Sequence, residues 1–115
     1  MDDEELRLKV FFFRSESGNE PVREWLKSLP MEDMRMIGAD IKSIQFGWPM
    51  GMPMVRKIEP GLWEIRSMLK ERIARIFFTV QGNKMVLLDG FIKKSDKTPQ
   101  EELHTARKRL SRMRG

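Results

Sequence analysis

The chain has 115 residues, of which 40% are hydrophobic and 34% charged, a composition typical of one soluble globular domain spanning residues 1–115. It contains no cysteine, which excludes disulfides, thiolate catalysis and cysteine-based zinc sites. The first ten residues are acidic where a signal peptide would be basic, and no apolar run approaches the roughly 20 residues of a membrane span. We therefore expect a cytoplasmic protein that does not engage a membrane.

The formal net charge of +5 is unevenly distributed along the chain. Residues 1–55 carry 7 Lys and Arg against 10 Asp and Glu, a net of −3, whereas residues 56–115 carry 15 against 7, a net of +8. A basic half predicts a polyanionic partner such as RNA, DNA or an acidic protein segment. The alternative is that the surplus charge only keeps a small protein in solution, and composition alone leaves both open.

The first half of the chain predicts one strand and two helices. Residues 6–13 (LRLKVFFF) alternate and then become continuously apolar, which favours a strand. A short helix follows, capped by Asn19 and ended by Pro30. Residues 31–47 predict an amphipathic helix, because apolar residues recur at spacings of three and four: Met34, Ile37, Ile41 and Ile44. Residues 48–55 are too rich in Pro and Gly for regular structure, and their methionines suit either the core or a partner surface.

The second half predicts a three-stranded meander and a final helix. Residues 62–68, 73–80 and 84–92 have the patterns of strands, and a tight turn joins the last two. Thr98 and Pro99 then open a helix whose basic residues gather at its C-terminal end, as the helix dipole favours. The order βααβββα predicts an α+β fold, with helices packed on one face of a mostly antiparallel sheet.

A cluster of cations is expected on the sheet face opposite the helices. Alternation places Arg66 and Arg75 on that face of adjacent strands, and Lys57 lies just before the first of them. Lys93 and Lys94 end the third strand. Like charges on one face repel each other by roughly 1 kcal/mol per close pair, which predicts a polyanion that neutralises them. A solvated charged face without a ligand is the alternative.

Such a face has the groups that cleavage of RNA requires. The neighbouring 2′-hydroxyl of RNA can act as the nucleophile if a base removes its proton and cations stabilise the phosphate oxygens. Arginine suits bidentate binding of phosphate, and a lysine surrounded by cations loses its proton more readily. Phe77 offers a ring on which a base can stack. No metal site is expected, because His104 is the one histidine and the carboxylates do not cluster at ligand spacings.

Three motifs follow one another between residues 61 and 110: Leu-Trp-Glu-Ile-Arg, Ala-Arg-Ile-Phe and Gly-Phe-Ile-Lys-Lys-Ser-Asp-Lys-Thr-Pro. In this combination the sequence resembles the RelE/ParE superfamily of bacterial toxins, and within it the HigB-like, phage-derived branch. The likeness extends over residues 6–113. It implies a RelE-like microbial RNase fold and a type II toxin that enters the ribosomal A site and cuts the mRNA being translated.

The resemblance also implies roles for individual residues. The basic positions that bind phosphate, stabilise the transition state or transfer protons are matched by Arg66, Arg75, Lys93 and Lys94. Lys57 and Lys97 are expected to contact the backbone of mRNA or ribosomal RNA. Several relatives use a tyrosine or a histidine in the site, whereas this chain has no tyrosine and His104 does not match such a position. The general base and acid therefore stay unassigned.

Two other functions remain open at this point. A ParE-like toxin would poison DNA gyrase without cleaving RNA, and a catalytically inactive basic module would bind RNA or protein only. Cations that converge on the sheet favour the nuclease, since gyrase poisoning does not need them there. The nuclease implies the ribosome and mRNA as partners, together with an antitoxin that carries a helix-turn-helix DNA-binding fold, and it implies no cofactor.

Overall fold

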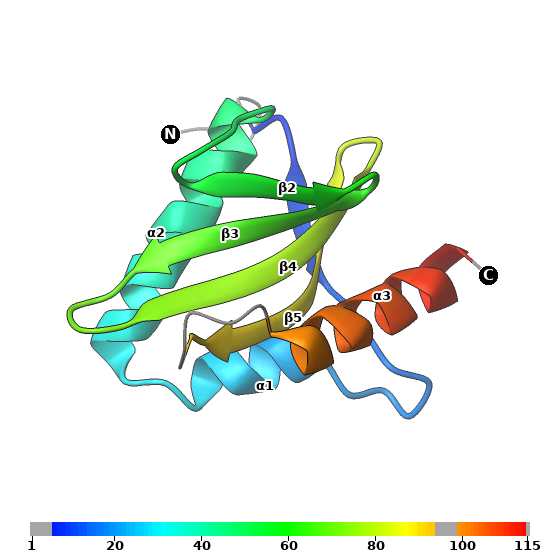
Figure 1. The fold of residues 1–115 in the computed structure, drawn as a ribbon, viewed down its shortest axis with the longest axis horizontal. Helices are drawn as coiled ribbons and strands as arrows, with labels where there is room; N and C mark the ends of the chain where they lie inside the picture. The colour runs from blue at the N-terminus through cyan, green and yellow to red at the C-terminus, as the bar shows by residue number, and fades with distance from the viewer. Residues whose placement is uncertain (1–5, 94–98, 115) are drawn as a thin grey trace.

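The computed structural model describes residues 6–93 and 99–114, which are arranged around one five-stranded sheet (Figure 1). In chain order the elements are β1 (Lys9–Phe12), α1 (Pro21–Lys27), α2 (Met31–Gly47), β2 (Val55–Glu59), β3 (Leu62–Met68), β4 (Ile73–Gln81), β5 (Lys84–Ile92) and α3 (Gln100–Arg114). The strands lie in the order β1-β5-β4-β3-β2. β1 runs parallel to β5, and the other neighbours are antiparallel. The predicted α+β class and mostly antiparallel sheet are confirmed.

β2 is a strand that the sequence did not predict. It is short and forms one edge of the sheet, and its first residue, Val55, is its only buried one. A β-bulge between Lys57 and Glu59 interrupts its pairing with β3. These features leave no clean alternation in the sequence, which is why the strand was not predicted. The observed order is βααββββα, whereas the predicted order was βααβββα. A smaller correction concerns α1, where Glu20 and not Asn19 occupies the N-cap position.

The helices pack on both faces of the sheet, so the expectation of a single helical face is wrong for α3. α1 and α2 cover one face, where the core includes Ile37, Ile44, Ile65, Ile76 and Phe78. α3 lies across the other face (Figure 1), over a second core that includes Leu62, Phe77, Leu88, Leu103 and Leu110. The physical reason lies in β4, where residues 74–79 are all buried. A strand that is apolar on both sides needs a layer on each.

Two glycines set the hairpin turns that align the central strands. Gly61 between β2 and β3 has φ of 81°, and Gly82 between β4 and β5 has φ of 61°. Residues other than glycine rarely adopt such positive φ values. The tight turn predicted after residue 80 is thereby confirmed. The separate β3–β4 hairpin, whose turn spans residues 69–72, places Arg66 opposite Arg75, and Glu64 lies between β2 and β4.

A third glycine allows α1 to approach β5 closely. A Cβ atom placed on Gly90 would lie 2.5 Å from two ring atoms of Trp25, closer than real side chains tolerate. The indole therefore packs directly against the backbone of β5. This contact fixes the end of the strand from which Lys93 extends.

Candidate nucleic-acid interface

Four cations surround a buried carboxylate on the face that carries α3. The register places Arg56 of β2, Glu64 and Arg66 of β3, and Arg75 of β4 on this face, and Lys93 follows β5 there. We call Arg56, Arg66, Arg75 and Lys93 the cationic face. It lies toward the β3–β4 turn, whereas α3 covers the other part of the same side of the sheet (Figure 1).

Glu64 and Arg75 form a buried ion pair within the cationic face. Arg75 Nη1 lies 3.6 Å from Glu64 Oε2, and the two side chains are 9% and 2% exposed. Neither Glu64 Oε1 nor Arg75 Nε has a hydrogen-bond partner among the described residues. Burial raises the pKa of the Glu64 carboxyl, and the four cations, Arg75 above all, oppose that rise. An ion pair that is buried but incompletely hydrogen-bonded contributes little to stability, so packing around it has to offset its cost.

Arg66 lies directly opposite Arg75 across the β3–β4 ladder. Two like charges in this position destabilise a sheet. Arg66 is half-buried, and within residues 6–93 and 99–114 its Nε has no hydrogen-bond partner, as is true of Arg75 Nε. Both Nε atoms are buried, so their N–H groups do not face solvent, and contact with an anion falls to the exposed Arg56 and the half-buried Arg66.

Two expectations about exposure are wrong. Phe77 was expected to present its ring to solvent, but it is 2% exposed, because α3 packs over it and its ring lies 5.6 Å from that of Phe91. Base stacking on Phe77 is therefore not available in this structure. Arg75 was expected to be exposed and is 7% exposed, because it lies beside Glu64. The cationic face opens to solvent through Arg56 and Arg66 instead.

The other predicted site residues divide into three groups. Lys93 follows β5 on the cationic face, as expected. Lys57 is exposed but pairs with Trp63, so the register turns it to the face that carries α1 and α2. Its neighbour Arg56 takes the expected place, and sequence reasoning missed it because β2 was not recognised. Two residues lie outside the described part of the chain: Lys94 and Lys97.

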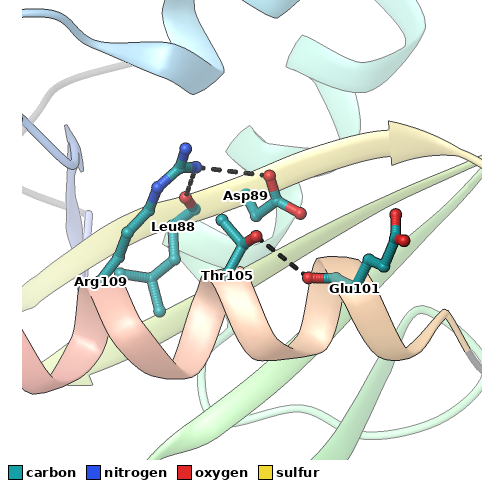
Figure 2. A network of polar contacts seen from close by, with 5 residues as sticks. All are labelled: Leu88, Asp89, Glu101, Thr105 and Arg109. Atoms are coloured by element: carbon teal, nitrogen blue, oxygen red, sulfur yellow. Dashed lines mark hydrogen bonds and ion pairs between the residues drawn. The ribbon is translucent and has the colours of Figure 1, made fainter.

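A second polar network fastens α3 to β5 (Figure 2). Arg109 Nη1 donates to the carbonyl oxygen of Leu88 at 2.7 Å and lies 3.3 Å from Asp89 Oδ1. Burial raises the pKa of Asp89 to about 6, although Arg109 acts in the opposite direction, and the nearby Glu102 adds to the rise. Nothing in the sequence pattern singled out this network, because its members are distant in the chain.

Asp89→Asn is expected to flatten the pH dependence of stability between about pH 4 and pH 6. The folded-state pKa of about 6 lies above the ordinary value of 3.8, so the folded protein holds this proton more tightly than the unfolded chain. Ionisation of the buried carboxyl should therefore remove on the order of 2–3 kcal/mol of stability as the pH rises through this window. Urea unfolding of both proteins across the window measures the difference. Parallel curves for the two proteins would contradict the assignment.

The described ranges hold no trio of His, Cys, Asp or Glu side chains placed to bind a metal ion. The helices within these ranges are also too short or too polar to cross a membrane.

The sequence matches one family model over most of its length. The family is described as Phage derived protein Gp49-like (DUF891), and the match spans residues 24–111, about three-quarters of the chain. The chain belongs to this family. The Gp49-like family is one of the RelE/ParE-like toxin families, which supports the predicted superfamily, a toxin of the RelE type and, in general, an antitoxin partner. No curated protein matches the chain. The matched segment contains the whole cationic face of this Gp49-like protein.

Proposed function

We propose that this Gp49-like protein is the toxin of a type II toxin–antitoxin system, of the HigB-like branch, and acts in the cytoplasm as a metal-independent endoribonuclease on translated mRNA. The observation that carries the proposal is the cationic face, whose four cations gather around one buried carboxylate and which opens to solvent through Arg56 and Arg66. A phosphodiester supplies anionic oxygens to these cations, and arginine binds such oxygens in bidentate fashion.

The chemistry follows from the position of each group. The 2′-hydroxyl of RNA attacks the adjacent phosphorus, the bond to the 5′-oxygen breaks, and a 2′,3′-cyclic phosphate and a 5′-hydroxyl result. Arg66 and Arg75 stabilise the charge on the phosphate oxygens. Lys93, with Lys94, exchanges protons with the attacking and leaving oxygens.

Glu64 has a different role, because a side chain that is 2% exposed cannot touch RNA. It is a positioning residue that holds the Arg75 guanidinium in place. The outer contacts to mRNA or ribosomal RNA come from Arg56 and Lys57 on the β2 edge, and from Lys97. An antitoxin with a helix-turn-helix fold, as in the HigB-like branch, neutralises the toxin.

Expression of this protein alone is expected to arrest growth and to shorten mRNAs that are being translated. The purified toxin should cut mRNA on programmed ribosomes in the presence of a chelator, because no metal takes part in the proposed reaction. Primer extension on total RNA and on the purified reaction measures the cut sites. Intact mRNA together with inhibited supercoiling by gyrase would support the ParE-like alternative. Intact mRNA with unaffected gyrase would support the inactive binding module.

A further inference from the structure

The outer side of β1 is an open sheet edge. β1 ends the strand order, and among the described residues no strand pairs with its outer side. The backbone N–H groups of Lys9 and Phe13 donate to the β4–β5 turn and to β5. Because successive residues of a strand point their backbone groups to opposite sides, those of Val10 and Phe12 point outward. An edge of this kind is a template for a further strand.

An apolar groove adjoins β1 on each face of the sheet. On the α3 face, a groove of about 400 Å³ has among its lining residues Phe11, Phe13, Val86 and Met113. On the opposite face, a groove of about 380 Å³ beside α1 and α2 has among its lining residues Val10, Phe12, Leu26 and Ile41. Phe11 is 45% exposed, which is unusual for so large an apolar side chain. Alternate side chains of an added strand would enter the two grooves in turn.

The rims of both grooves are basic. Five cations are among the lining residues, two on the α3 face and three on the other: Arg14, Arg112, Arg23, Lys27 and Lys42. Glu16 is the one acidic residue in either lining. Lys84 adds a further cation, with its Nζ 5.8 Å from the centre of the Phe11 ring. Charge complementarity therefore favours an acidic segment and opposes a basic one.

β2, the other edge of the sheet, is protected against pairing with a further strand. It carries a β-bulge and the exposed charges of Arg56 and Lys57, which are devices that protect an edge strand from pairing. The comparison singles out β1 as the edge that is suited to strand addition.

We infer that β1 is the docking edge for an acidic, extended segment of the antitoxin, which adds a sixth strand to the sheet. The apolar side chains of that segment fill the two grooves, its carboxylates face the basic rims, and its backbone pairs with Val10 and Phe12. The inference rests on the proposed function, because it assumes an antitoxin. β1 and the cationic face lie toward opposite edges of the sheet, so the antitoxin is anchored away from the cleavage residues and blocks entry to the ribosome by its bulk.

The test uses the full-length toxin co-expressed with the protein encoded by the adjacent reading frame. In the complex, hydrogen exchange at the amides of Val10 and Phe12 is expected to slow relative to the free toxin. Arg14→Glu and Lys42→Glu, one on each rim, should each weaken the complex by about tenfold, because both place a carboxylate against an acidic partner. Lys70→Glu is the matched control, since Lys70 is also exposed but lies in the β3–β4 turn, and it should leave the affinity unchanged.

Each outcome separates this inference from the proposed function. Neutralisation without protection of β1, or an equal loss of affinity in all three variants, would overturn the docking edge and leave the nuclease standing. Protection of β1 in a protein that neither arrests growth nor cuts mRNA would support the docking edge and remove the nuclease. If the rim variants weaken binding to ribosomes and not to the antitoxin, the rims bind RNA, and the inference is overturned. The absence of any complex would overturn it as well.

Discussion

Arg66→Ala is expected to lower the rate of mRNA cleavage on programmed ribosomes by at least about 10²-fold while the protein remains folded. The loss follows from the removal of one cation that stabilises the transition state. Stability should be unchanged or slightly higher, because the variant also removes the repulsion between Arg66 and Arg75 across the β3–β4 ladder. Single-turnover cleavage rates and urea unfolding measure the two effects separately. Arg66→Lys keeps the charge but lacks the planar guanidinium group. Its cleavage rate should lie between those of the unchanged protein and Arg66→Ala.

The control for this prediction is His104→Ala. His104 is the residue most readily suspected as a catalytic base, but it is exposed on α3 and is not a member of the cationic face. Its replacement should retain most of the cleavage rate. Loss of cleavage in a folded His104→Ala protein, with Arg66→Ala still active, would move the active site onto the final helix.

Glu64→Ala is expected to destabilise the protein by about 3–5 kcal/mol. The change leaves the guanidinium of Arg75 buried without its counter-ion, which is the costliest way to disrupt a buried ion pair. Urea unfolding measures the effect, and a loss below about 1 kcal/mol would show that the pair is not buried in solution.

The double variant Glu64→Leu with Arg75→Met separates stability from function. It replaces both charges with apolar side chains of similar size, and such exchanges are often neutral or stabilising. We therefore expect stability close to that of the unchanged protein, together with loss of cleavage. A stable double variant that still cuts mRNA would remove Arg75 from the catalytic machinery.

Periodicity alone located the elements that frame the site. α2 was predicted at residues 31–47 and β3 at residues 62–68, and both are observed at these bounds. α2 has a buried side and an exposed side, and residues 63–66 of β3 alternate between apolar and charged side chains, so both patterns are informative. The same alternation correctly assigned Arg66 and Arg75 to one face of the sheet.

The failures come from β4, which is buried on both sides over residues 74–79. Its pattern does not reveal which helix covers which side, so α3 was assigned to the wrong face. The expected exposure of Phe77 and Arg75 depended on that assignment and was therefore wrong. Glu64 is a related case. The cations around its buried carboxyl include residues from three other segments of the chain, and the alternation pattern of β3 does not reveal them.

The parallel pairing of β1 with β5 also determines when the chain can fold. Lys9 pairs with Lys84, so strands that are adjacent in the sheet are separated by most of the polypeptide. Pairing over such a distance is slow compared with hairpin formation, because a long loop has to close first. During synthesis β1 remains without its neighbour until β5 has left the ribosome, and Lys93 emerges later still. The ribosome must therefore finish nearly the whole chain before a copy with a complete sheet exists.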